Sequence, residues 1–214
     1  KGMTTAPFPK LGRGLVAILR GLKPAEAVAV GRVVFEAGIE AIEVPLNSPE
    51  PFVSIAAIVK ALPKTALVGA GTVLTAADVD RLNEAGGRLL VSPNIDAEVM
   101  ERARTHGMVT MPGVFTPTEA FLALRLGASA LKFFPASVLG AGGIAAMRAV
   151  LPADTLVGAV GGVSDKDFAG YKAAGVTVFG LGSSLFKPGM SVEEVAARAR
   201  AAVIAWDAAF GGAQ

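Results

Sequence analysis

Eight short apolar runs recur along the chain, and this repetition constrains the fold more than any other feature of the sequence. Each run is almost continuously apolar, which is typical of strands in a parallel sheet whose two faces are both covered. The predicted strands occupy residues 15–21, 41–47, 66–74, 88–94, 108–114, 130–136, 155–163 and 176–186.

Segments with helical spacing lie between these runs. Most of them have a Pro, Thr or Ser at or next to the start and a Gly at or next to the end, which are the usual start and stop signals of helices. The predicted helices occupy residues 23–38, 75–87, 116–128, 140–152, 164–175 and 191–210, and the start of 140–152 is obscured by its glycines. A further helix ends near His106, where we expect the imidazole to meet the last carbonyl groups.

The alternation of strand and helix predicts an α/β fold, a (β/α)8 TIM barrel, because parallel strands with crossover helices can close and lose their edges. An open doubly wound sheet is the alternative. No linker or low-complexity stretch interrupts the pattern, so residues 15–214 are expected to form one domain after an N-terminal segment, residues 1–14. Lys1 and Gly2, which precede Met3, are expected to be a cloning remnant.

Composition excludes several classes of function. Of the 214 residues, 52% are hydrophobic and 18% charged, with a net charge of +2, no cysteine and a single histidine. Disulfides, thiolate metal sites, cysteine nucleophiles and multi-histidine metal clusters are therefore ruled out. The scattered Lys and Arg residues predict no nucleic-acid partner, and the absence of an apolar run of ~18 residues predicts no membrane partner. We expect a cytoplasmic protein whose slight positive charge suits small anionic ligands.

Three charged side chains stand inside the apolar runs, past their opening residues: Arg20, Glu43 and Lys132. Closing a barrel would bring all three toward the end at which barrel enzymes carry their catalytic groups. A lysine in an apolar site beside another cation loses proton affinity, and its free amine can form a Schiff base with a carbonyl. Glu43 would then act as general base and acid, and Arg20 would hold a carboxylate. The alternative is that Glu43 and Lys132 form a buried structural ion pair.

Two glycine-rich segments stand at the ends of the last two predicted strands, "AVGGV" at 159–163 and "GLGSS" at 180–184. Glycines allow backbone N–H groups to approach an anion closely, and barrels frequently bind phosphate at these two positions. Alternatively, the glycines only ease tight turns. The segment "GAGT" at 69–72 could aim Thr72 at a carboxylate oxygen, although this short motif is weakly specific.

As a set, the motifs "VAILRG", "IEVPLNSP", "GAGTVL", "VSPN", "MPGVFTPTEA", "LKFFPAS", "AVGGV" and "GLGSSLF" are highly specific. From about Leu15 to the closing helix, the sequence resembles the family of 2-keto-3-deoxy-6-phosphogluconate and 2-keto-3-deoxy-6-phosphogalactonate aldolases, which are class I, pyruvate-forming lyases. The resemblance implies a homotrimer that needs no metal or other cofactor.

The resemblance also implies a role for each candidate residue. Lys132 would be the Schiff-base lysine and Glu43 the proton-shuttling carboxylate. Arg20 and Thr72 would lie at the carboxylate and keto end of the substrate, and Phe134 against the bound pyruvate unit. The phosphate would be surrounded by Gly162, Gly182 and Ser183, with Gly161 close by.

Two departures bear on which sugar is cleaved. Gluconate-type members of the family carry an Arg-Thr-Pro sequence where this chain has Asn47-Ser-Pro, and a Thr where it has Val160. Both departures resemble the galactonate-type enzymes, and a valine lacks the hydroxyl that could read the configuration at C4. The galactonate substrate is therefore favoured, and cleavage of the gluconate or of 4-hydroxy-2-oxoglutarate is the alternative. The more remote rivals are a sugar-phosphate isomerase or synthase and a phospholigand-binding barrel without catalysis.

Overall fold

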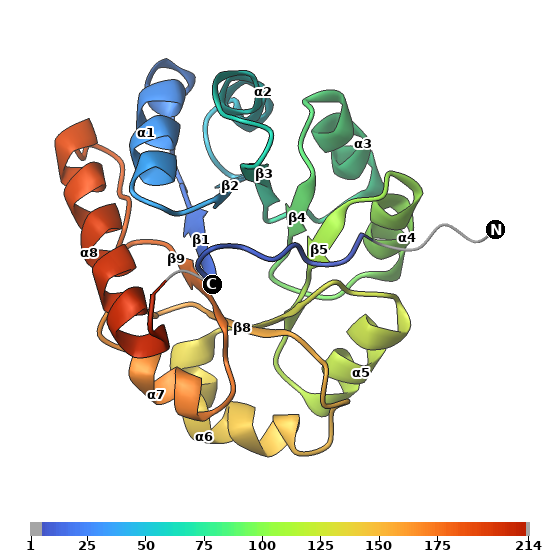
Figure 1. Cartoon of the computed structure of the whole chain (residues 1–214). Coiled ribbons are helices and arrows are strands. Elements are labelled where there is room, and N and C mark those ends of the chain that lie inside the picture. The colour runs from blue at the N-terminus through green and yellow to red at the C-terminus, as the bar shows by residue number, and fades with distance from the viewer. Residues whose placement is uncertain (1–5, 213–214) are drawn as a thin grey trace.

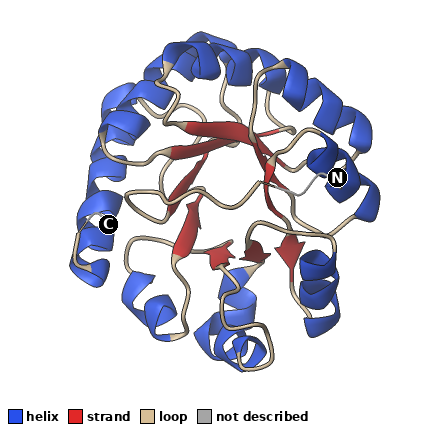
Figure 2. Cartoon of the chain, turned by 45° about the vertical axis from the view of Figure 1, so that its right-hand side comes forward, coloured by secondary structure: helices blue, strands red, loops and turns tan. Residues whose placement is uncertain are grey.

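The computed structural model describes residues 6–212, and within them nine parallel strands form one sheet that curls into a nearly closed barrel with helices outside (Figures 1 and 2). Each strand is short and buried, as the apolar runs predicted. The strands are β1 (Leu15–Ile18), β2 (Ala41–Pro45), β3 (Leu67–Gly71), β4 (Leu89–Val91), β5 (Val109–Met111), β6 (Gly113–Val114), β7 (Leu131–Phe133), β8 (Val157–Val160) and β9 (Val178–Leu181).

Helices alternate with the strands and form the outer layer. They are α1 (Pro24–Glu36), α2 (Pro51–Ala61), α3 (Ala76–Glu84), α4 (Ala97–Thr105), α5 (Pro117–Arg125), α6 (Ala136–Arg148), α7 (Phe168–Ala173) and α8 (Val192–Phe210). Helices α5 and α8 begin with capping boxes, in which Thr116 pairs with Glu119 and Ser191 with Glu194. These caps satisfy backbone N–H groups that a helix leaves free in its first turn. No helix in residues 6–212 combines the length and apolar character needed to cross a bilayer.

The predicted count of eight strands is not confirmed, because the run at 108–114 is divided into β5 and β6 at Pro112. Proline has no backbone N–H and interrupts a ladder of hydrogen bonds. The run still bonds on both sides: β5 pairs with β4, and the Lys132 N–H donates to the Pro112 carbonyl across 2.9 Å. The strand order runs around a ring, so the open doubly wound alternative is wrong.

Other expectations differ in detail. The 140–152 helix begins earlier than predicted, at Ala136, and is kinked at Gly140, whose φ is 72°. His106 does lie at the end of α4, but its Nε2 contacts Asp80 Oδ1 of α3 at 2.7 Å instead of a last-turn carbonyl. The expected cloning remnant, Lys1 and Gly2, lies outside the described residues.

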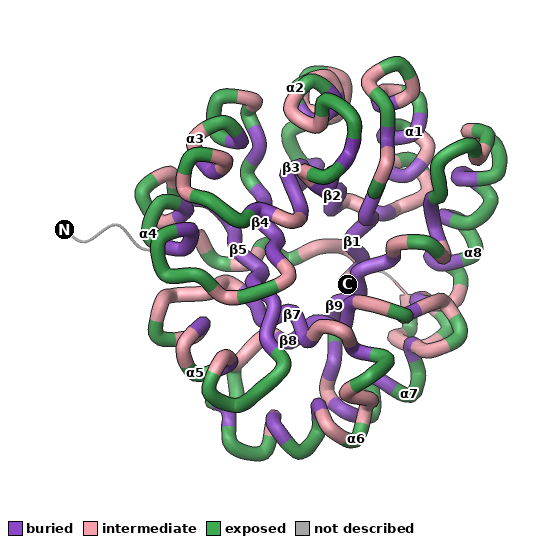
Figure 3. Tube along the Cα trace, turned by 180° about the vertical axis from the view of Figure 1, so that it is seen from behind, coloured by how far each residue is buried: buried purple, intermediate pink, exposed green. Residues whose placement is uncertain are grey.

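Side chains alternate between the inside of the barrel and the helix layer, as the period of two in a strand requires. A cluster of inward-pointing residues, here called the lumen cluster, fills the inside: Val16, Ile18, Ala41, Leu67, Leu89, Val91, Val109, Met111, Ala130, Val160 and Val178. A larger cluster packs the outer face of the sheet against the helices. Buried segments accordingly gather at the ring of strands and exposed segments on the outer helices (Figure 3).

The amino end of the barrel is covered by the N-terminal segment, which crosses it in Figure 1. Ala6, Phe8 and Leu11 pack against the lumen cluster. The Ala6 backbone N–H donates to the Met108 carbonyl at 3.3 Å, and its carbonyl accepts from Ser129 Oγ at 2.6 Å. Ala6, Phe8 and Leu11 therefore extend the lumen cluster at this end, whereas Pro7, Pro9 and Lys10 are exposed.

Candidate active site

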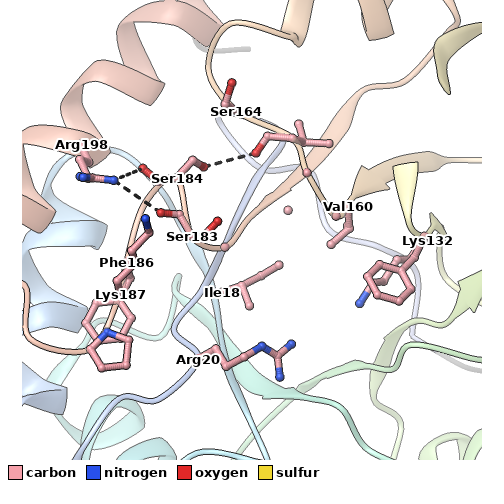
Figure 4. A pocket seen from close by; sticks show the side chains of 17 residues that line it. Ile18, Arg20, Lys132, Val160, Ser164, Ser183, Ser184, Phe186, Lys187 and Arg198 are labelled. Carbon is pink, nitrogen blue, oxygen red and sulfur yellow. Dashed lines mark hydrogen bonds between the residues drawn. The ribbon is translucent and has the colours of Figure 1, made fainter. Parts of the chain in front are cut away.

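A cavity of about 760 Å³ lies at the carboxyl ends of β1, β7, β8 and β9 (Figure 4). This is the end at which barrel enzymes carry their chemistry. Eight of the ten residues predicted for the site line this cavity: Arg20, Lys132, Phe134, Val160, Gly161, Gly162, Gly182 and Ser183. The other two, Glu43 and Thr72, do not line it, but both lie next to residues that do.

Lys132 lies in the middle of β7 and points into the barrel, two residues after the inward-facing Ala130. Its neighbours on both adjacent strands, Gly113 and Gly158, have no side chains. The residue is 5% exposed, and its Nζ lies 4.7 Å from the centroid of the Phe134 ring. Burial lowers the pKa of Lys132 from 10.5 to about 8, and although Glu43 acts in the opposite direction, Arg20 lowers it further.

Glu43 reaches the same region from β2, on the far side of the ring, and is 1% exposed. Burial raises the pKa of its carboxyl group from 4.5 to about 7, although Lys132 and then Arg20 favour the charged form. Its Oε2 accepts no hydrogen bond within the described part of the chain, and no direct ion pair there joins it to Lys132. The geometry therefore disfavours the structural ion pair considered above and leaves both groups able to exchange protons near neutral pH.

Glycine at position 71, the last residue of β3, makes room for this carboxylate. A Cβ added to Gly71 would lie 2.1 Å from Glu43 Oε2. The next residue, Thr72, has a left-handed backbone with a φ of 54°, a conformation that non-glycine residues seldom adopt. Strain of this kind is concentrated at functional sites.

Arg20, which follows β1, is fixed by two neighbouring loops. Its Nη1 donates to Asn47 Oδ1 and lies 3.4 Å from Thr72 Oγ1. Three successive strands thus place Arg20, Asn47 and Thr72 in one polar group beside the amine and the carboxylate. This group is suited to hold a carboxylate or keto oxygen.

The two glycine-rich segments lie side by side on the opposite wall of the cavity. Gly161 and Gly162 have φ angles of 94° and 70°, which a side chain would strain, and a Cβ at Gly162 would lie 2.6 Å from Ser137 Oγ. Among the described residues, the backbone N–H groups of Gly162, Ser183 and Ser184 donate to no acceptor. The two segments therefore offer free N–H donors of the kind that bind anions.

Sequence reasoning missed two further cations on the cavity wall, Lys187 and Arg198. Lys187 belongs to the loop after β9, and Arg198 reaches in from α8, where its Nη1 lies 3.5 Å from the Ser183 carbonyl and 3.2 Å from the Ser184 carbonyl. Both side chains are exposed, and exposed Lys and Arg residues are too common on surfaces for the sequence to single them out.

Comparisons with known proteins identify relatives of this chain. The probable 2-dehydro-3-deoxy-6-phosphogalactonate aldolase of Rhizobium meliloti (strain 1021) is 59% identical over 99% of this chain and 100% of its own length. The 2-dehydro-3-deoxy-6-phosphogalactonate aldolase of Escherichia coli (strain K12) is 50% identical over 90% of this chain and 94% of its own. A solved structure described as native KDPGal superposes with a TM-score of 0.92 at 48% identity, covering 97% of this chain and all of that one.

The family described as KDPG and KHG aldolase matches residues 12–201, which include every residue of the site described above. The matched range contains the buried amine on β7, the carboxylate on β2 and the glycine-rich wall after β8 and β9. This chain belongs to the KDPG and KHG aldolase family.

Proposed function

We propose that this protein is a class I aldolase that cleaves 2-dehydro-3-deoxy-6-phosphogalactonate to pyruvate and D-glyceraldehyde 3-phosphate through a Schiff base on Lys132. One observation carries the proposal. An amine of lowered pKa and a carboxyl group of raised pKa share the carboxyl end of the barrel without an ion pair between them. Two groups whose pKa values are shifted toward each other in this way suit proton transfer near neutral pH.

The first step is the attack of the Lys132 amine on the C2 carbonyl of the substrate. A pKa of about 8 in place of 10.5 raises the fraction of free amine at neutral pH by roughly two orders of magnitude. The carbinolamine that forms loses water, with proton transfer through Glu43, and leaves a positively charged iminium on C2. This iminium can accept the electron pair of the C3–C4 bond.

Glu43 then removes the proton of the C4 hydroxyl group, directly or through a water molecule. The C3–C4 bond breaks, and its electrons pass into the iminium to give an enamine while C4 leaves as the aldehyde of glyceraldehyde 3-phosphate. Protonation at C3 and addition of water at C2 release pyruvate and restore the amine. The raised pKa of Glu43, about 7, allows one carboxyl group both to take up and to return protons.

Groups on opposite walls of the cavity would hold the two ends of the substrate. Arg20 and Thr72, which lie 3.4 Å apart, would bind the carboxylate and keto end. The free N–H groups of Gly162 and Ser183 would bind the phosphate, with Gly161 and Gly182 allowing its close approach. Phe134, whose ring lies against the Lys132 amine, would pack on the pyruvate unit. Binding at both ends keeps C2 beside the amine.

The test is reductive trapping. Borohydride reduction in the presence of pyruvate should attach an irreversible adduct to the peptide that contains Lys132, and mass spectrometry will locate it. Lys132→Ala should give neither adduct nor turnover in an assay for released pyruvate. An unmodified Lys132 in an active wild-type enzyme would rule out the Schiff base, and a wild type that releases no pyruvate would rule out the aldolase.

The choice of the galactonate epimer rests on Asn47 and Val160 and on the names of the two relatives reported above. Val160 lines the cavity beside Gly161 and is 5% exposed, so its side chain is placed to contact the middle of the substrate. The two C4 epimers should be assayed side by side with the wild type and with Val160→Thr. A wild-type kcat/KM higher for the gluconate epimer would overturn the choice.

We also infer the properties that the family resemblance implies for the whole molecule. The chain from residue 15 onward would be a single (β/α)8 domain in which β5 and β6 are two parts of one strand. Three copies would associate in the cytoplasm, and the exposed side chains of Leu74, Phe115 and Phe121 offer apolar surface for that contact. Light scattering in solution should give three times the chain mass of 21.6 kDa, and the chain mass itself would contradict the trimer.

A further inference from the structure

The glycine-rich wall of the cavity, where we place the phosphate, contains a turn whose shape depends on contacts with residues outside the turn. The turn spans residues 182–186, and the Gly182 carbonyl accepts from the N–H groups of Leu185 at 2.9 Å and Phe186 at 3.0 Å. The carbonyl groups of Ser183 and Ser184 take no part in these bonds. Ser184 Oγ is held separately, because it donates to the Val163 carbonyl at 3.3 Å and so ties the turn to the other glycine-rich segment.

The guanidinium group of Arg198 contacts those two carbonyls. Its Nη1 lies 3.5 Å from the Ser183 oxygen and 3.2 Å from the Ser184 oxygen. In Figure 4 the turn lies between Arg198 on one side and Ile18, Val160 and Lys132 on the other. Arg198 can reach this position because its neighbours on α8, Val195 and Ala199, are buried against the barrel. This packing fixes the base of its side chain next to the turn.

The planarity of the peptide bond connects these contacts with the cavity. In a trans peptide the carbonyl group of one residue and the N–H group of the next point in opposite directions. When Arg198 holds the Ser183 carbonyl, it therefore also directs the Ser184 N–H away from itself. That N–H donates to no group among the described residues. A charged donor on a carbonyl forms a stronger hydrogen bond than a neutral one, and it also adds positive charge near a bound anion.

We propose that Arg198 is a positioning residue for the phosphate end of the substrate. It fixes the orientation of the Ser183 and Ser184 peptide groups so that the Ser184 N–H joins those of Gly162 and Ser183 as a phosphate donor. This inference rests on the proposed function, since it requires a phosphorylated substrate at this wall. It assigns Arg198 no part in the chemistry at Lys132, which lies across the cavity.

The experiment compares Arg198→Gln with Arg200→Gln as the matched control. Arg200 is exposed on the same helix and has no hydrogen bond or ion pair among the described residues. Arg198→Gln should raise KM for the phosphorylated keto acid about tenfold and weaken competitive inhibition by inorganic phosphate by a similar factor, with kcat nearly unchanged. Borohydride trapping of pyruvate, which has no phosphate, should proceed at the wild-type rate. Arg198→Lys should give an intermediate KM, because an ammonium keeps the charge but lacks the planar fork.

Several results would overturn the inference. One is an unchanged KM and phosphate inhibition in Arg198→Gln. Another is a loss of kcat and of pyruvate trapping in parallel with the KM effect, since that would indicate general damage to the barrel. An equal effect in Arg200→Gln would show that only the overall charge matters. The wild-type controls keep the two proposals apart, because an enzyme that neither traps nor releases pyruvate contradicts the proposed function and leaves nothing for Arg198 to position.

Discussion

The two ends of the barrel treat their charged groups in opposite ways. At the amino end, Arg13 forms a two-pronged ion pair with Asp207 at 2.7 and 2.8 Å, and the Glu40 carboxylate accepts from the Gly12 N–H at 2.9 Å. At the carboxyl end, Glu43 and Lys132 are more deeply buried, yet neither has an ion-pair partner among the described residues. Paired charges near the surface support the fold, whereas buried charges without partners destabilise it and are retained where chemistry requires them.

The comparison predicts that changing the carboxyl end affects activity first. Glu43→Gln keeps the size and shape of the side chain but removes its ability to take up a proton. We expect kcat to fall by a factor of about 100 to 10,000, because general acid–base catalysis contributes that much. Inhibition by inorganic phosphate, for which we proposed a site on the opposite wall, should stay at the wild-type value. A kcat within a few-fold of the wild type would remove Glu43 from the mechanism.

The second prediction concerns stability and reverses the usual expectation for core substitutions. The double variant Lys132→Met/Glu43→Leu replaces both buried charges with apolar side chains of similar size. It should lose all activity and gain about 1–4 kcal/mol in the free energy of unfolding, measured with urea. A decrease in the free energy of unfolding would instead indicate that Glu43 and Lys132 form a structural ion pair.

The gain of the double variant in the free energy of unfolding should also depend on pH. Folding raises the pKa of Glu43 from 4.5 to about 7. The contribution of Glu43 to the stability of the wild type is therefore most favourable below pH 4.5, where the group is protonated in both the folded and the unfolded state, and it is lost as the pH rises toward 7. The double variant lacks this group, and its advantage over the wild type should therefore be larger at pH 7.5 than at pH 5. An equal or smaller advantage at pH 7.5 would contradict the raised pKa.

At the amino end of the barrel, a substitution should change stability and leave activity unchanged. Arg13→Ala removes one partner of a partly buried, two-pronged ion pair and should lower the free energy of unfolding by about 1–2 kcal/mol. Because the pair lies far from the cavity, kcat and KM should not change. Arg104→Ala, which breaks an exposed pair with Glu101, serves as the control and should cost less. A change in KM on replacing Arg13 would show that the two ends are coupled.

The smallest expected effect concerns the interaction of the two catalytic groups. The Glu43 carboxylate raises the pKa of Lys132, while burial and Arg20 lower it. Glu43→Gln removes that negative charge, so the pH at which pyruvate trapping reaches half its maximum should move down. Comparison of complete pH profiles separates this shift from a slower overall rate. A midpoint that stays in place or moves up would show that the two groups do not interact.

Much of the barrel could be predicted because its strands are buried on both faces and therefore read as apolar runs. From the same regularity we expected Arg20, Glu43 and Lys132 to lie toward the same end of the barrel, but we did not predict which face of the sheet their side chains occupy. Pro112 lacks a backbone N–H and could have predicted the division between β5 and β6, but this signal was not used. Strand ends were predicted too far along, to 163 and 186, because the glycine-rich segments leave the ladder at Val160 and Leu181.

The contacts that complete the site depend on distances that the sequence does not contain. Arg20 and Asn47 meet only because β1 and β2 are neighbours with matching ends, and Asn47 was noticed for its identity and not for this hydrogen bond. Arg198 and Arg200 are both exposed on α8, so only the position of the turn after β9 distinguishes Arg198.

Gly71 has a consequence for how this catalyst can be dissected. Its backbone lies in an ordinary strand, so alanine fits there conformationally, yet the added methyl group would occupy the place of the Glu43 carboxylate. A single carbon atom can thus displace the carboxyl group without changing its chemical identity. Gly71→Ala therefore tests the position of the proton donor separately from its chemical identity.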